Sequence, residues 1–422
     1  MELHFWMVLV QIMTLEVIWG KIGFKKDLNM NVEFPPTIIR HRNENIPAGH
    51  LRPLGWQRRP EGKITEEKEM LKPQKFYSRF VKNKKPVVFR GVADEVPAMK
   101  QWEKDSTLDK KYGKLDVMVT VKNSMLKSTG PIKLKLKKFL REYEYENWYL
   151  ATTTPHEMMH ELLLPKCLRC STMRKNLVES EVWMSSGGTS STLHYHADHD
   201  IHCILDGRKD FILIHPKYKS DITFVEKSPH SGSGHSTVDV DMVNAFKDSK
   251  LAATPWHYTT LLAGDCIFIP ADYLHQVRSY GRSISYTVLW SPTPKVDIKD
   301  CNEEVENKFT LLTDASFMWT FADGDKLLFN SRLNPESTRQ HLLGLMRTDS
   351  ELYYDRFHLF YNESLSEVRD APDSSEVFKS LDPNNQGFIT REAVEKLDNM
   401  RLQELADVLN RAHAHGHKHD EL

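Results

Sequence analysis

The stretch from Ser191 to Pro216, STLHYHADHDIHCILDGRKDFILIHP, decides the fold. It begins with His194 and His196, continues through an apolar run typical of a β-strand, turns at a glycine, and enters a second apolar run that begins near Lys209. Residues two apart on a strand point to the same side. We therefore predict that His194 and His196 project into one cavity, with Tyr195 facing away.

A third imidazole, His275, comes much later, within the run GDCIFIPADYLHQV. Three histidines from two strands of one barrel form a typical metal site, because neutral imidazole binds Fe(II), Zn(II) and Cu(II). The alternative is a polar surface strand, and the particular order of the flanking residues argues against it. We predict that His194, His196 and His275 bind one metal ion.

The order of these features resembles the JmjC family of cupin-barrel, 2-oxoglutarate-dependent Fe(II) oxygenases. The motifs are HxH, an apolar strand, Gly-Arg-Lys, a second apolar strand ending at proline, and I-P-x-x-x-x-H. The resemblance runs from about Phe76 to Pro292. It implies an α+β fold, with a double-stranded β-helix (cupin or jelly-roll) barrel and flanking helices over residues 73–295. A C-terminal α-helical module is expected over residues 300–418.

In the family, a facial triad of His, Asp and His holds the iron, and 2-oxoglutarate and O₂ take the remaining positions. The resemblance places the first ligand at His194, the second at His196 and the last at His275. The chain departs from the family at the second ligand, where HxH replaces HxD. A shifted register that pairs His196 with Asp198 would restore HxD, but it shortens the distance to the following glycine by two residues.

The residues that hold the cosubstrate in the family have matches here. Lys209 matches the basic residue that pairs with the distal carboxylate of 2-oxoglutarate. Burying an unpaired ammonium costs several kcal/mol, so Lys209 implies an anionic guest. Ser191 and Tyr149 match hydroxyl positions with the same role. Asp200 lies where the family often has Asn, and its carboxylate would either compensate for the charge missing at His196 or repel the dianion.

Histidine in place of aspartate removes one negative charge beside a dication. Metal binding is expected to survive, whereas the effect on O₂ activation stays open. The resemblance implies an Fe(II)/2-oxoglutarate-dependent oxygenase acting as a protein hydroxylase. The alternative is a catalytically silent, metal-binding barrel that serves as a protein-interaction module. Tyr286 and Trp290 either wall the pocket or belong to an ordinary aromatic core.

The two ends of the chain predict its compartment. Residues 1–20 read as a secretory signal peptide, with an uncleaved signal anchor as the alternative, and no later segment reaches transmembrane length. Residues 419–422, HDEL, form an endoplasmic reticulum retrieval signal read by the HDEL receptor. We expect a protein of the endoplasmic reticulum lumen whose partner is a protein or peptide substrate of the secretory pathway. Asn362 begins a glycosylation sequon usable there.

Charge and cysteine content fit that expectation. A formal net charge of −1 over 422 residues argues against nucleic acid as an obligatory partner. An oxidising lumen permits disulfides. Cys167 and Cys170 are spaced for a local disulfide, and Cys203 and Cys266 are expected to be small buried hydrophobes. Residues 21–72 are polar, contain prolines and are expected to form an extended arm.

Within the helical module, residues 382–393 resemble an EF-hand loop, so a weak Ca²⁺ site is expected. Position 12, normally a bidentate glutamate, is Ala393. EF-hands usually pair, but no second loop of this type is found in the sequence, which leaves pairing with another chain open. The expected ligands are Asp382, Asn384, Gln386 and the backbone oxygen of Phe388.

Overall fold

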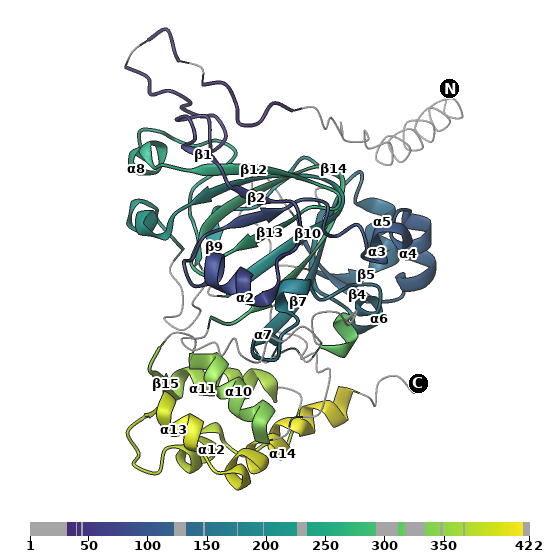
Figure 1. The fold of residues 1–422 in the computed structure, drawn as a ribbon, viewed down its shortest axis with the longest axis vertical. Helices are drawn as coiled ribbons and strands as arrows, with labels where there is room; N and C mark the ends of the chain where they lie inside the picture. The colour runs from purple at the N-terminus through teal and green to yellow at the C-terminus, as the bar shows by residue number, and fades with distance from the viewer. Residues whose placement is uncertain are drawn as a thin grey trace, which may run out of the picture.

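The computed structural model describes residues 32–416, except 39, 44, 122–131, 147, 175, 197, 226–233, 293–310, 316, 318–332, 334, 347–348 and 366–367. It contains a β-barrel with helices on its outside and a group of C-terminal helices at the lower end of Figure 1. The expected signal peptide and HDEL tail lie outside the described residues. Among the helices that are described, none is long and apolar enough to cross a membrane.

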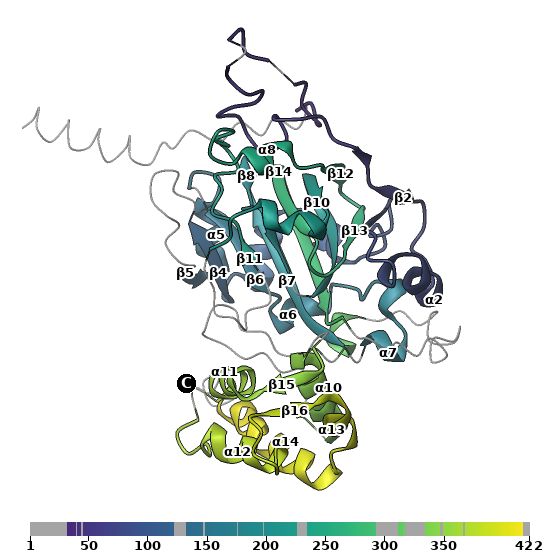
Figure 2. The same cartoon turned by 90° about the vertical axis from the view of Figure 1, so that its left-hand side faces the viewer.

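Two long antiparallel strands, β10 (His199–Ile214) and β14 (Leu274–Trp290), form the centre of the barrel. Their register shifts between Ile204 and Arg208, and both strands bend there (Figure 2). Gly207 allows the bend, because its φ is +79° and a Cβ atom would lie 2.4 Å from the carbonyl oxygen of Arg282. Each strand therefore contributes one half to each of two facing sheets.

The other strands extend these two sheets. The strand order in the larger path is β2-β3-β13-β10-β14-β7-β6-β4-β5. Next to the first half of β10 and the second half of β14 lie β2 (Thr65–Glu67), β3 (Val87–Phe89), β13 (Cys266–Ile269), β7 (Leu177–Ser185), β6 (Trp148–Thr153), β4 (Asp116–Val121) and β5 (Ile132–Lys135). Next to the opposite halves lie β12 (His257–Leu262), β1 (Gly62–Lys63), β8 (Thr189–Ser190), β9 (His194–Tyr195) and β11 (Gly234–His235).

Alternation along β10 divides its side chains between two cores. Ile201, Cys203 and Leu205 join an outer core beneath the helices, whereas Ile204 and Phe211 belong to the core within the barrel. The first helix of the barrel domain is α2 (Pro73–Phe76), continued by a π-helical turn η1 (Tyr77–Val81). The other helical segments around the barrel are α3 (Ala98–Gln101), α4 (Asp105–Tyr112), α5 (Leu136–Glu142), α6 (His156–Met159), η2 (Lys166–Leu168), α7 (Ser171–Arg174), η3 (Pro216–Asp221), α8 (Ser249–Ala253) and η5 (Leu312–Asp314).

The segment 21–72, expected to be an extended arm, joins the sheets near its C-terminal end. Gly62–Lys63 pairs with β12 and Thr65–Glu67 pairs with β3, so this segment belongs to the sheets. Upstream, the backbone N–H of Leu51 donates to the carbonyl of Val243 at 2.8 Å. The folded barrel domain therefore begins before residue 73.

The cysteine expectations are also wrong. Cys203 and Cys266 form a disulfide, because they lie directly opposite each other on β10 and β13 with their Cα atoms 4.0 Å apart. Cys167 is a free, buried thiol, so it does not pair with Cys170, which is itself disulfide-bonded. Cross-strand register decides the first pair, and spacing along the chain does not reveal it.

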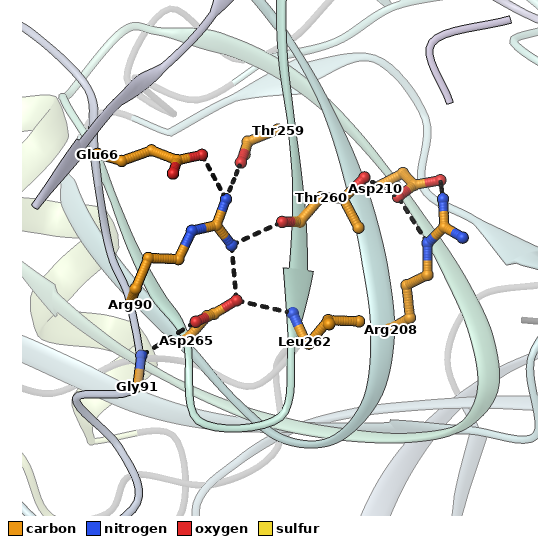
Figure 3. A network of polar contacts seen from close by, with 9 residues as sticks. All are labelled: Glu66, Arg90, Gly91, Arg208, Asp210, Thr259, Thr260, Leu262 and Asp265. Atoms are coloured by element: carbon orange, nitrogen blue, oxygen red, sulfur yellow. Dashed lines mark hydrogen bonds and ion pairs between the residues drawn. The ribbon is translucent and has the colours of Figure 1, made fainter. Parts of the chain in front are cut away.

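A polar network joins four strands at the end of the barrel where β10 bends (Figure 3). Arg90 donates to Asp265 at 2.6 Å, to the carbonyl of Thr260 at 2.8 Å and to Glu66 at 2.6 Å. Asp265 also accepts from the backbone N–H of Gly91 at 3.0 Å. These bonds connect β2, β3, β12 and the start of β13, and they satisfy a carboxylate that is mostly buried.

The C-terminal helices have a core of their own. Strand β15 pairs with β16 in antiparallel fashion, so the EF-hand-like loop pairs with a segment of the same chain. The elements are α10 (Pro335–Met346), β15 (Glu351–Tyr353), α11 (Tyr354–Ser364), α12 (Ser374–Leu381), β16 (Phe388–Thr390), α13 (Arg391–Lys396) and α14 (Asn399–Gly416).

Candidate metal centre

Three imidazoles converge at the mouth of the barrel. His194 on β9 lies directly opposite His275 on β14, and His196 follows β9. One ligand nitrogen from each ring lies within 4.8 Å of the others, and this is the one group of three or more potential metal-ligating residues among those described. The alternation read from the sequence therefore places the two neighbouring histidines on one side. Tyr195 points away and packs against Phe224.

Backbone carbonyls fix the orientation of two of these rings. Nδ1 of His194 lies 2.8 Å from the carbonyl oxygen of Thr192, and Nδ1 of His275 lies 3.1 Å from that of Tyr273. A carbonyl only accepts, so Nδ1–H donates and Nε2 keeps its lone pair for a metal. Burial lowers the pKa of His275 to about 3, which keeps this ring neutral and able to ligate across the physiological range.

The shifted register with Asp198 as a ligand is wrong. Asp198 accepts a hydrogen bond from the hydroxyl of Ser291 at 3.2 Å and does not belong to the histidine group. The chain therefore offers three neutral nitrogen donors, with no carboxylate at the second ligand position.

Lys209 lies inside the barrel behind the imidazoles. Its side chain is 1% exposed, and its ammonium lies 5.9 Å from the ring centroid of Tyr149 on β6. Burial lowers the pKa of Lys209 to about 7, although the charge of Asp200 opposes this shift. The hydroxyl of Ser191 accepts from the backbone N–H of Val277 at 2.9 Å. Of the three expected cosubstrate residues, the structure places Lys209 and Tyr149 side by side.

The wall opposite the imidazoles carries polar residues that the sequence reading did not single out. Strand pairing aligns Glu181 on β7, Thr287 on β14 and His202 on β10 in one row across the inner face. Thr287 accepts from Nε1 of Trp183 at 3.1 Å and lies 2.8 Å from Nδ1 of His202. The alternation of Asp200 and His202 along β10 was a usable signal, whereas the neighbours on β7 depend on strand pairing.

Asp200 and His202 have polar atoms without partners. Oδ1 of Asp200 and Nε2 of His202 are buried and make no hydrogen bond within the described residues. Burial raises the pKa of Asp200 to about 8 and lowers that of His202 well below its usual range. Both groups are therefore neutral near pH 7, and a ligand that hydrogen-bonds to them would satisfy these buried polar atoms.

Tyr286 and Trp290 do not wall the pocket. Trp290 stacks on Phe268 with ring centroids 5.6 Å apart, and the hydroxyl of Tyr286 donates to the carbonyl of Leu163. Both lie in the outer core, since they alternate with the inward-facing Thr287 along β14. Of the two interpretations of these aromatic residues, the ordinary core is the correct one.

Fold and site together define a cupin-type barrel with a histidine metal centre at its mouth. The chain belongs to the family described as the cupin-like domain, whose family model matches residues 73–296, just over half of the chain.

Several relatives have JmjC names. The chain is 27% identical over 218 residues to lysine-specific demethylase JMJ30 of Arabidopsis thaliana, covering 49% of this chain and 50% of that protein. It is 24% identical over 228 residues to lysine-specific demethylase 8 of Xenopus tropicalis, covering 51% and 50%. It is 30% identical over 116 residues to JmjC domain-containing protein D of Dictyostelium discoideum, covering 26% and 25%. The chain thus spans half or less of the length of these relatives.

The JmjC family generally uses Fe(II) and 2-oxoglutarate, and the residues present fit both. Three imidazole nitrogens suit a divalent transition metal. Lys209 is a buried ammonium without an ion pair among the described residues, and a carboxylate guest would satisfy it. When bound together, Fe(II) and 2-oxoglutarate supply oxidising power derived from O₂. The protein's own part is to hold the metal with neutral rings and the acid with Lys209.

Replacing His275 by alanine is expected to reduce bound metal from about one ion per chain to near zero, because two imidazoles alone hold a divalent ion weakly. His196→Asp is expected to keep the metal, since a carboxylate completes the facial triad. Metal content per chain, measured by inductively coupled plasma mass spectrometry after anaerobic loading, checks both. His257→Ala, on β12 outside the histidine group, is the matched control. Full metal content in His275→Ala would contradict the site.

Proposed function

We propose that this protein is an Fe(II)/2-oxoglutarate-dependent protein hydroxylase. The observation that carries the proposal is the convergence of His194, His196 and His275 in front of the buried Lys209. Membership of the cupin-like family and the JmjC relatives support the cofactors. The alignments cover half of JMJ30 and half of lysine-specific demethylase 8. The lumenal location that we propose below would separate the protein from chromatin, so hydroxylation is preferred over demethylation.

The charge around the metal separates this protein from an HxD barrel. Three neutral donors leave the full charge of a dication uncompensated in a buried setting. Asp200 is the inward-facing carboxyl on β10, and it can ionise when a cation enters the barrel, because the cation lowers its raised pKa. In this proposal the missing negative charge is carried by the wall of the barrel and not by a metal ligand.

A second candidate function is a catalytically silent metal-binding barrel used for protein interaction. The observation that favours it is the same neutral donor set, because no carboxylate ligand tunes the iron for O₂. His202 and Asp200 also give the interior an unusual polarity for a dianionic guest. Turnover of 2-oxoglutarate by the metal-loaded protein distinguishes the two candidates.

Succinate release from 2-oxoglutarate is expected for the Fe(II)-loaded wild type with secretory-pathway peptides. His196→Asp is expected to release succinate faster if the missing carboxylate limits the rate. Lys209→Ala is expected to raise the KM for 2-oxoglutarate about 30-fold or more, because it removes a buried charge partner. Lys396→Ala, an exposed lysine paired with Glu392, should leave KM unchanged. Fully metal-loaded wild type and His196→Asp that both release no succinate would establish the silent barrel.

Binding of 2-oxoglutarate at pH 8 is expected to take up about one proton. Burial lowers the pKa of Lys209 to about 7, so this amine is mostly neutral at pH 8 and must be protonated to pair with the guest. The affinity should therefore fall about tenfold per pH unit above pH 8, because the carboxylates of the guest are already ionised. Isothermal titration calorimetry of the metal-free protein, in two buffers of different ionisation enthalpy, measures the uptake. No proton uptake would show that the guest does not pair with Lys209.

We also propose that the protein resides in the endoplasmic reticulum lumen. The disulfide between Cys203 and Cys266 and the bonded state of Cys170 support an oxidising compartment. The hydrophobic leader at 1–20 and the HDEL ending at 419–422 support import and retrieval.

Expression of the full chain in eukaryotic cells is expected to give one N-glycan at Asn362, which is exposed on α11. Endoglycosidase H should increase the gel mobility of wild type and of the control Asn45→Gln, but not that of Asn362→Gln. Deleting residues 419–422 should cause secretion, because the retrieval signal is lost. Wild-type protein that carries no glycan and fractionates with the cytosol would contradict the proposed location.

A further inference from the structure

The C-terminal helices contain two loop-and-helix units joined by a short antiparallel ribbon. Strand β15 pairs with β16 so that Leu352 lies opposite Ile389. The loop at 382–393 connects α12 to α13, and the first unit connects α10 to α11 in the same way. Paired EF-hands join through the residue at position 8 of each loop, which in the second unit is Ile389.

The second loop has the backbone form of an EF-hand. Oδ2 of Asp382 accepts from the backbone N–H of Gly387 at 2.8 Å, and Asp382 is 5% exposed. Asn385 and Gly387 have φ angles of +52° and +78°, which produce the sharp turn that such loops need after the first ligand. The backbone conformation of an EF-hand loop is therefore present, although Ala393 at position 12 supplies no carboxylate.

The pairing of Leu352 with Ile389 allows EF-hand loop positions to be assigned in the first unit. Asp382, Gln386 and Ala393 lie seven before, three before and four after Ile389. The same offsets from Leu352 give Leu345 as position 1, Asp349 as position 5 and Arg356 as position 12. A guanidinium thus stands where a calcium-binding loop has its bidentate glutamate.

From position 12, the guanidinium of Arg356 donates hydrogen bonds to two oxygens of the same loop. Its Nη1 donates to the carbonyl oxygen of Leu345 and to Oδ2 of Asp349, both at 2.9 Å. Leu345 lies in the last turn of α10, where carbonyls have no partner within the helix. Arg391 of the second unit adds two bonds, from its backbone N–H to the carbonyl of Ser350 at 2.8 Å and from its side chain to that of Asp349 at 3.1 Å.

We propose that Arg356 is a built-in cation that replaces calcium in the first loop of this pair. The guanidinium stays charged at every physiological pH, so the unit closes without a divalent ion. A calcium ion held by the same oxygens would meet that fixed charge at close range and be repelled. The loop at 382–393 is then the one member of the pair left to take Ca²⁺, and the pair needs no calcium to fold.

An ordinary surface ion pair is a weaker account of these contacts. The side chain of Asp349 is 56% exposed, and pairs of that kind contribute little. The bond to the Leu345 carbonyl is different, because it caps α10 from the start of α11 and thereby fixes the connection between the two helices.

Hydrogen–deuterium exchange of the full-length protein, read on peptides covering 345–356, tests the proposal. In EGTA, Arg356→Gln is expected to exchange about tenfold faster there than wild type, because two charge-assisted bonds are lost. Arg401→Gln, which removes an exposed arginine paired with Asp398 on α14, should exchange like wild type. Wild-type protection of these peptides is expected to be the same in EGTA and in millimolar calcium.

Two further variants test the role of position 12. Arg356→Glu should lose protection at 345–356 in EGTA and in calcium alike, since position 1 is Leu345, which offers no side-chain oxygen to a calcium ion. Ala393→Glu is the positive control, with calcium-dependent protection of 382–393. Equal exchange in Arg356→Gln and Arg401→Gln, or wild-type protection lost in EGTA, would overturn the proposal. Stronger protection of 345–356 in calcium than in EGTA in the wild type would do the same.

Discussion

The bend shared by β10 and β14 is the constraint on which the barrel depends. Gly207 lies against the carbonyl of Arg282, and no larger residue can take its conformation. Because both strands cross from one sheet to the other there, the two halves of β10 face each other across the interior. His202 on the first half consequently meets Phe211 on the second, with ring centroids 5.7 Å apart. Lys209 lies on the second half of β10, where it pairs with Ser279 of β14, four residues beyond His275.

Electrostatics inside the barrel follow from this enclosure. A buried ammonium and a buried carboxyl both move toward their neutral forms, and the pKa values of Lys209 and Asp200 shift in opposite directions accordingly. A metal ion and an organic acid would reverse both shifts. With histidine at position 196, the negative charge that balances a bound metal would therefore come from the organic acid and from Asp200, and not from a ligand of the metal.

Much of this site could be predicted from the chain, because strand alternation is a local property. The convergence of His194 and His196 needed only a period of two, and the distant His275 needed a motif. Residues that neighbour each other across strands could not be predicted from alternation along one strand. The Cys203–Cys266 disulfide and the position of Trp183 beside Thr287 depend on register between strands far apart in sequence, which one chain does not reveal. The inward direction of Thr287 also required knowing that Trp290 faces the helices.

The barrel and the C-terminal helical module differ in how they would interact with a cation. In both, a nitrogen-containing side chain stands where a carboxylate ligand is expected. At the barrel mouth, histidine stands at position 196 where the JmjC pattern has a carboxylate, so a metal bound there would be held by nitrogens and other groups would have to balance its charge. In the helical module, Arg356 replaces a carboxylate, so the charge of the ion is supplied by the protein itself. The first change leaves the metal site open, because imidazole still offers a lone pair. The second closes the loop to metal, because a guanidinium has only donors to offer.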